Sequence, residues 1–119
     1  MSILKILLNL PWSLMAITYA VLSAPHTIMV KNNALIVRVH GFWWYPVKGV
    51  RAMTLGNVVL LGKNIKKADL EHEMIHIGQT MREPLIHPLL SLYQTLKYGY
   101  KNNKYEQEAY MKAKNRYDA

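Results

Sequence analysis

One stretch decides how this chain folds: Ala68-Asp69-Leu70-Glu71-His72-Glu73-Met74-Ile75-His76-Ile77-Gly78-Gln79-Thr80-Met81. Its apolar residues recur at helical spacing, which predicts an amphipathic helix over 68–81. The apolar stripe lies within about 60° of arc and consists of Leu70, Met74, Ile77 and Met81. We therefore expect this helix to bury one side against a core and to leave the other side for chemistry.

Two histidines lie one turn apart in this helix, in the sequence His72-Glu73-Met74-Ile75-His76. At about 100° per residue, positions i and i+4 are about 40° apart, so both imidazoles can reach one ion. Glu73 lies beside them, close enough to act on a water molecule held by that ion. The pattern predicts a divalent metal site with a carboxylate next to it. A catalytic zinc generally takes three protein ligands, so one more is needed.

Three glutamates are candidates for the third ligand: Glu83, Glu106 and Glu108. Glu83 lies next to Pro84 at the end of the same helix, too far along it to fold back easily. Glu106 and Glu108 lie about 200° apart on a helix predicted over 104–116, so only one of them can face the site.

The residues that share a helix face with each of the two downstream glutamates indicate which one is the better candidate ligand. Glu106 shares its helix face with the small residues Ala109 and Ala113, which would let this helix approach the first one closely. Glu108 shares its face with Lys112 and Asn115, a composition typical of a solvated surface. We therefore expect Glu106 to be the third ligand.

The rest of the chain predicts an α+β domain. Segments 27–30 and 34–39 have strand character and are joined by an Asn-rich tight turn at 31–33. A third strand is expected over 57–61, between two glycines, and two further helices over 85–98 and 104–116. We expect a three-stranded antiparallel sheet packed on the helix over 68–81.

The N-terminal stretch has no charged residue from Ile6 to Val30, a composition shared by signal peptides and membrane anchors. Pro11 should end a helix begun at Ser2, and a second helix to about residue 23 is too short to cross a bilayer upright. Leu22-Ser23-Ala24 is a poor cleavage signature. We expect residues 1–24 to form a packed, inhibitory or membrane-associated segment before a domain over 25–119. A cytoplasmic or membrane-associated location is favoured over secretion.

Composition narrows the chemistry further. The 119 residues include no cysteine, which excludes disulfides, thiolate metal sites and cysteine nucleophiles. Residues 1–68 carry eight basic residues and no acid, within a net charge of +8 for the whole chain. No basic run with interleaved aromatic residues is present, so no nucleic-acid partner is expected. The N-terminal segment is instead a candidate for contact with a membrane or another anionic surface.

The motif helix, Gln79 and the later segment Glu106-Gln107-Glu108-Ala109 together resemble gluzincin-type zinc metallopeptidases. The likeness is greatest to the small single-domain minigluzincins. It implies one Zn²⁺ per chain, held by His72, His76 and Glu106, with Glu73 as the general base for peptide-bond hydrolysis. Tyr110 stands where these families often have an aspartate.

The resemblance also implies a substrate site. The strand before the motif helix would be the sheet edge along which an extended peptide lies, which assigns substrate binding to Asn57, Val58, Val59 and Leu60. Zincins usually add a tyrosine or histidine that stabilises the oxyanion. Six residues remain candidates for this role: Tyr93, Tyr98, Tyr100, Tyr105, Tyr110 and His87. On its own, His87 is expected to be a surface or capping histidine.

Two alternative interpretations stay open. The domain could hold zinc without turnover, with the N-terminal segment or another chain, including a second copy, covering the cleft. The histidine motif could also be accidental in a basic protein of membrane surfaces or of protein–protein contacts. In the peptidase interpretation, the partner is a peptide or protein substrate.

Overall fold

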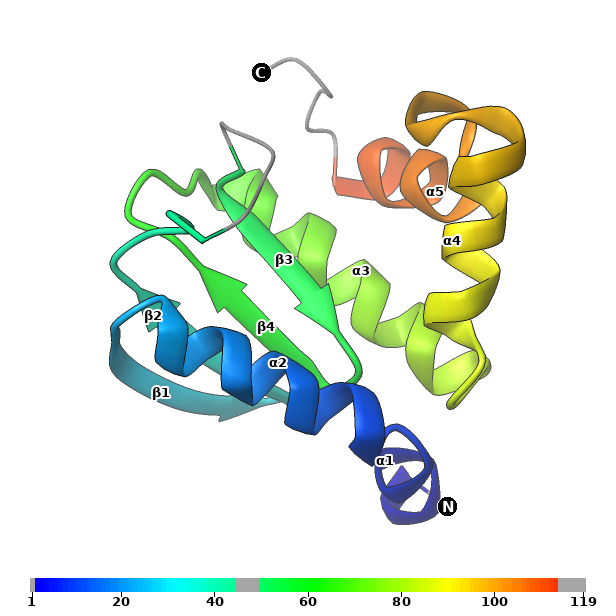
Figure 1. The fold of residues 1–119 in the computed structure, drawn as a ribbon. Coiled ribbons are helices and arrows are strands. Elements are labelled where there is room, and N and C mark those ends of the chain that lie inside the picture. Colours follow the sequence, from blue (N-terminus) through cyan, green and yellow to red (C-terminus); the bar gives the residue numbers. More distant parts are fainter. Residues whose placement is uncertain (1, 45–49, 114–119) are drawn as a thin grey trace.

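A four-stranded mixed sheet lies between helices in the computed structural model, which describes residues 2–44 and 50–113 (Figure 1). In chain order the elements are α1 (Ser2–Leu8), α2 (Leu10–Leu22), β1 (Pro25–Lys31), β2 (Ala34–Val39), β3 (Ala52–Leu55), β4 (Val58–Leu61), α3 (Lys67–Arg82), α4 (His87–Tyr98), a short 3₁₀ helix η1 (Tyr100–Asn102) and α5 (Lys104–Ala113). The α+β class expected from the sequence is confirmed.

The strand order is β1-β2-β4-β3. The first hairpin is as expected: β1 and β2 pair antiparallel, and the turn residues Asn32 and Asn33 have φ of 47° and 68°. Positive φ at both positions is what a two-residue hairpin turn requires, and Asn tolerates it. The expectation of a three-stranded antiparallel sheet is wrong, because β2 and β4 pair parallel and β3 adds a fourth strand.

The strand β4 lies inside the sheet. It pairs with β2 on one side and with β3 on the other, and all four of its residues are buried. The prediction that 57–61 forms the sheet edge is therefore wrong. Asn57, Val58, Val59 and Leu60 belong to the core or its border and have no open edge along which a peptide could add. The edge beside α3 is β3, which is short and was not recognised.

The sheet separates two apolar layers. Because side chains alternate along a strand, Val58 and Leu60 of β4 face α2, whereas Val59 and Leu61 face α3. On one side Ala16 and Ala20 of α2 enter the core. On the other side Ile77 is buried against the sheet, and the rest of the predicted stripe (Leu70, Met74 and Met81) packs around it. The helix that carries the histidine motif is thus fixed to the sheet along its apolar stripe.

The two N-terminal helices break at Asn9, close to the break expected from Pro11. Asn9 is fully buried, and its side chain joins three segments. Its amide nitrogen donates to Asn57 Oδ1 at 3.0 Å and to the carbonyl of Thr80 at 3.3 Å, and its Oδ1 accepts the backbone N–H of Leu85 at 2.7 Å. Among the residues described, no helix has the length and apolar character needed to cross a membrane.

The C-terminal helices are held together by Asn103, which is fully buried between them. Its Oδ1 accepts the backbone N–H of Tyr105 at 2.8 Å, which caps the start of α5. Its amide nitrogen donates to the Ser91 carbonyl and to Thr95 Oγ1 on α4. The helix predicted over 104–116 is observed to Ala113, and its expected last residues, 114–116, lie outside the described ranges.

Candidate metal centre

The start of α3 is fixed by an ion pair. Asp69 in its first turn accepts the backbone N–H of Lys66 at 2.9 Å, as a capping carboxylate does. The same carboxylate accepts two hydrogen bonds, at 2.7 and 2.9 Å, from Arg51, the residue just before β3. The hydrogen bond with Asp69 raises the pKa of Arg51, which therefore stays charged. This bidentate pair ties α3 to the edge strand and sets the orientation of the histidine motif.

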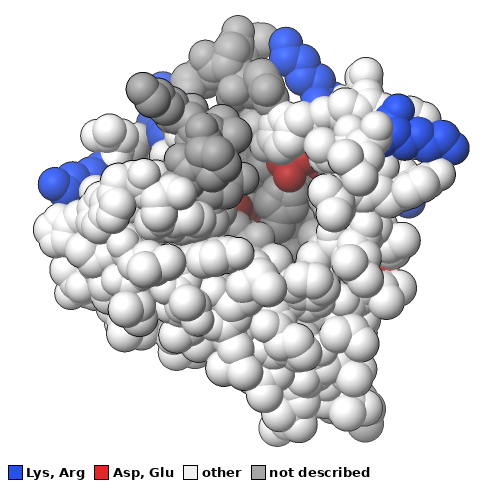
Figure 2. All heavy atoms as spheres, in the orientation of Figure 1, with Lys and Arg blue, Asp and Glu red and all other residues white. Residues whose placement is uncertain are grey.

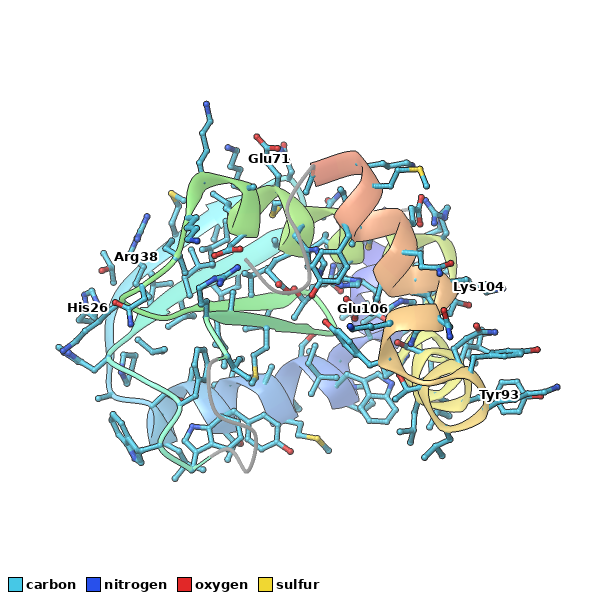
Figure 3. The ribbon with its side chains drawn as sticks, turned by 90° about the horizontal axis from the view of Figure 1, so that it is seen from above. His26, Arg38, Glu71, Tyr93, Lys104 and Glu106 are labelled. Carbon is cyan, nitrogen blue, oxygen red and sulfur yellow. The ribbon has the colours of Figure 1, made fainter. Side chains whose placement is uncertain are left out.

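Three side chains converge between α3 and α5. His72 Nε2 and His76 Nε2 lie 3.0 and 3.1 Å from Glu106 Oε1, and 3.2 Å from each other. Figure 3 shows Glu106 directed toward the interior, between α5 and the sheet. These three residues form a group that could hold a metal ion. Four-coordinate zinc with bonds of about 2.0–2.1 Å separates its ligands by about 3.3 Å, so only a small expansion is needed.

The close approach of α5 explains why Glu106 reaches the histidines. Ala109 and Ala113, on the α5 face toward α3, are buried, as the sequence predicted. Glu108 points elsewhere: its carboxylate bonds to Arg82 at 2.9 Å and to Lys112 at 2.7 Å. Glu83, the third candidate, caps the C-terminal end of α3. Of the three glutamates, the structure brings Glu106 to the two histidines.

The side chain of Gln79 determines which nitrogen of His76 carries a proton. Its amide nitrogen faces two acceptors, the carbonyl of Tyr105 at 2.9 Å and Glu108 Oε1 at 2.7 Å. Its oxygen faces His76 Nδ1 at 2.7 Å and must accept a hydrogen bond from it. Neutral His76 is therefore protonated on Nδ1 and presents a lone pair at Nε2, the arrangement that metal-binding histidines use.

This arrangement places two electron-rich atoms face to face. With its proton on Nδ1, neutral His76 has no hydrogen to place between Nε2 and Glu106 Oε1, which lie 3.1 Å apart. Either a proton or a metal ion must therefore lie between them. Burial lowers the pKa of His76, but Glu106 opposes this more strongly and raises it to about 9. Burial likewise raises the pKa of Glu106, and the hydrogen bonds with both histidines reverse this and hold it well below its usual range.

Glu73 is buried next to the group. Its Oε1 accepts a hydrogen bond from Thr54 Oγ1 of β3 at 2.6 Å. Burial is the largest effect on Glu73 and raises its pKa, against the charges of the two histidines, which lower it. A carboxylate with a raised pKa is a better proton acceptor near neutral pH than a solvated one. Thr54 was not foreseen, because β3 was not recognised in the sequence.

Two tyrosines complete one wall of the site. The Tyr100 hydroxyl donates to Glu106 Oε1 at 3.0 Å, and Tyr110 donates in turn to Tyr100 at 3.1 Å. The Tyr110 ring packs on His72, with ring centroids 4.3 Å apart. Burial, followed by the charge of Glu106, raises the pKa of Tyr100, so this phenol keeps its proton. Tyr110 thus contributes a ring contact to His72 and a hydroxyl group that bonds to Tyr100.

The remaining candidates for oxyanion stabilisation lie farther away. Tyr93 and Tyr98 are exposed on α4, and Figure 3 shows Tyr93 pointing away from Glu106. The expectation of a surface position for His87 is wrong: it is buried, and its Nε2 lies 3.2 Å from Gln79 Oε1. Its ring packs edge-on against Tyr105. Burial lowers the pKa of His87 to about 4, so it is neutral and donates to Gln79.

Comparison with known proteins adds no relative. No protein-family model, no curated protein and no solved structure matches this chain. The site is therefore interpreted from its own geometry. That geometry establishes an α+β domain with a His/His/Glu group able to hold a metal ion.

Proposed function

We propose that this protein is a zinc-dependent peptidase whose metal is held by His72, His76 and Glu106. The observation that carries the proposal is the convergence of two imidazole nitrogens and one carboxylate oxygen within 3.2 Å of one another. A nitrogen, nitrogen and oxygen donor set suits zinc. Bound there, zinc would supply Lewis-acid activation of a peptide carbonyl and of water.

Glu73 is the general base in this proposal. It is the next residue after His72 on α3, and it is buried at the site, where Thr54 donates a hydrogen bond to it. Its carboxylate would accept the proton of the attacking water and later donate it to the leaving amine. The Thr54 hydroxyl holds one carboxylate oxygen, which leaves the orientation of the group fixed before substrate arrives.

The tyrosine pair supplies hydrogen-bond donors on the other side of the group. Tyr100 keeps its proton and bonds to Glu106, and Tyr110 bonds to Tyr100. Either hydroxyl could turn to an oxyanion that develops beside the metal, a contact generally worth a few kcal/mol. Their position next to the ligands favours them over Tyr93 and Tyr98, which are exposed on α4.

The substrate edge in this proposal is β3. It is the outer strand of the sheet on the side of Glu73, and Thr54 on this strand already contacts that residue. An extended peptide that adds to a sheet edge gains main-chain hydrogen bonds with little demand on its side chains. A domain of this size would then cleave extended peptides with low selectivity.

The test compares Glu73→Gln with Glu71→Gln in protein purified without added metal. Glu71 is exposed on the same helix, and Figure 3 shows it pointing away from Glu106. We expect one zinc per chain by elemental analysis in the wild type and in both variants. Hydrolysis of an unfolded protein substrate should fall by about 10²–10⁴-fold in Glu73→Gln and stay unchanged in Glu71→Gln.

Two results would contradict the proposal in different ways. If the wild type neither contains nor takes up a divalent metal, the metal site itself is refuted. If it binds zinc at one per chain and hydrolyses no peptide, the group is a zinc site without peptidase activity. Equal loss of hydrolysis in both variants would show that Glu73 is not the general base.

A further inference from the structure

Two helices carry matching rows of exposed aliphatic side chains. The row on α2 consists of Leu10, Leu14, Ile17 and Val21, which are 39–67% exposed. The row on α4 and the turn before it consists of Leu85, Leu89, Leu92 and Leu96, which are 41–77% exposed. Both follow the spacing i, i+4, i+7, i+11, which places each row within about 60° of arc on a helix. Such rows are normally the buried faces of amphipathic helices.

The two rows adjoin at Leu85. The backbone N–H of Leu85 donates to Asn9 Oδ1 at 2.7 Å, and its carbonyl accepts the indole N–H of Trp12 at 2.7 Å. The start of α2 therefore contacts the start of the α4 row. Helix α1 extends the first row with Ile3, Leu4, Leu7 and Leu8, which are 41–74% exposed. These twelve residues are called the aliphatic face below.

The acidic residues of the chain avoid the segments that carry this face. All seven acidic residues lie within 69–83 and 106–118, whereas the stretches 1–68 and 84–105 contain only basic ones. Helices α1, α2 and α4 all belong to these two acid-free stretches. Figure 2 shows the side of the molecule that α1 and α2 cover, and the lowest part of this view shows no Lys, Arg, Asp or Glu side chain. Lys and Arg appear at the margins of the same view.

We propose that the aliphatic face rests in the interface of a lipid bilayer that contains anionic headgroups. In this arrangement α1 and α2 lie along the membrane plane, as interfacial helices do. Lys97 on α4 lies over the rings of Tyr93 and Tyr98, at 5.5 and 5.4 Å from their centroids. Tyrosine and lysine beside an apolar row are typical of residues at the level of lipid headgroups.

Charge favours lipid over a second copy of this chain. A soluble monomer seldom exposes so many large aliphatic side chains on adjoining segments, so something is expected to cover them. Pairing two chains would bring together two molecules that each carry a net charge of +8. Anionic lipid would instead be attracted by that charge, with about 1 kcal/mol for each basic residue near the surface.

The test is flotation of the full chain with phosphatidylcholine vesicles, with and without phosphatidylglycerol. We expect binding to the mixed vesicles that weakens with salt and with removal of phosphatidylglycerol. Leu14→Gln/Val21→Gln removes apolar surface from the face without adding charge, and should lower the partition coefficient by about tenfold or more. The matched control is Val30→Gln/Met111→Gln, at residues 78% and 76% exposed on β1 and α5. It should bind as the wild type does.

Several results would overturn the proposal. One is a wild type that stays unbound with both kinds of vesicle; another is equal binding by the two double variants. A third is self-association in sedimentation that Leu14→Gln/Val21→Gln abolishes while vesicle binding is unchanged, which would assign the face to a second copy. Leu89→Gln/Leu92→Gln repeats the test on α4. Zinc content, measured alongside, separates this proposal from the peptidase proposal.

Discussion

The amide oxygen of Gln79 lies 2.7 Å from Nδ1 of His76, one turn earlier on the same helix. Both donors of that amide are occupied, by the Tyr105 carbonyl and by Glu108, so the amide cannot turn round. This contact fixes the tautomer of His76 and points its Nε2 lone pair at the carboxylate of Glu106. Outer contacts of this kind orient metal ligands and are commonly worth a factor of about 10–100 in metal affinity.

Replacing Gln79 should therefore weaken metal binding while the ligands stay in place. We expect Gln79→Leu to lower the affinity for zinc by about 10–100-fold, measured by competition with a chelator of known affinity. The control is Gln107→Leu on the exposed side of α5, which should bind zinc as the wild type does. Equal affinities for the two variants would show that the amide does not hold His76.

Alanine substitutions of the two glutamates of α5 should differ sharply in their effect on zinc affinity. Glu106→Ala removes a candidate ligand that lies 3.0 and 3.1 Å from the histidines, and should lower zinc affinity by more than about 100-fold. Glu108→Ala removes ion pairs to Arg82 and Lys112 near the surface, and should change affinity by only a few-fold. Zinc titration of the metal-free proteins measures both. Similar losses would show that Glu106 is not a ligand.

His87 gives the protein a specific response to acid. Its pKa is about 4 in the folded protein, against 6.5 in an unfolded chain, because it is buried. The unfolded state therefore takes up a proton first, and the stability that neutral His87 provides is lost as the pH falls from about 6.5 to about 4. We expect His87→Gln to reduce the loss of stability over this window, measured by urea unfolding. His26→Gln, on exposed β1, is the control, and it should follow the wild-type curve.

Alanine substitutions at two glycines should change the free energy of unfolding in opposite directions. Gly56 has φ of +60°, and a Cβ there would lie 2.5 Å from Ser13 Oγ and 2.6 Å from Ser13 N. Gly56→Ala should lower the free energy of unfolding by about 2–4 kcal/mol. Gly78 is helical and has nothing within 4 Å of its Cβ position, so Gly78→Ala should raise it by about 0.5–1 kcal/mol. A Gly56→Ala protein as stable as the wild type would mean that α2 does not pack at this turn.

The candidate site was largely predictable because its residues lie in short sequence patterns, each of which determines one helix face. The i, i+4 spacing places His72 and His76 on one side of a helix whatever surrounds it. Small residues beside Glu106 identified the face of α5 that approaches α3, and the structure confirms the resulting His/His/Glu group. What the sequence could not show was the set of contacts from distant segments. Thr54 reaches Glu73 from the edge strand β3, and His87 is buried where the start of α4 packs beside Gln79 and Tyr105.

The sheet was less predictable because strand pairing is non-local. The β1–β2 hairpin was recognisable from its Asn-Asn turn, which pairs neighbours in sequence. The parallel pairing of β2 with β4 joins two strands that are not consecutive in the chain, and no local pattern encodes it. The four residues of β3, Ala-Met-Thr-Leu, lack the alternation of apolar and polar residues that marks a half-buried strand, and all four are partly buried. The resemblance to zinc peptidases assigned the sheet edge to the strand over 57–61, but β3 occupies that edge.

The strained turn at Leu85 links the N-terminal helices to the start of α4. Leu85 has φ of 71°, a conformation that costs a non-glycine residue about 1–2 kcal/mol, and side chains from the N-terminal helices hold both its N–H and its carbonyl. His87, two residues later, donates a hydrogen bond to the side-chain oxygen of Gln79, and the same oxygen accepts one from His76. Asn9 and Trp12 thus support the His/His/Glu group from a distance, through Leu85, His87 and Gln79. If a lipid or a protease displaced the N-terminal helices, Leu85 would lose these two hydrogen bonds, and the position of His76 would be less tightly fixed.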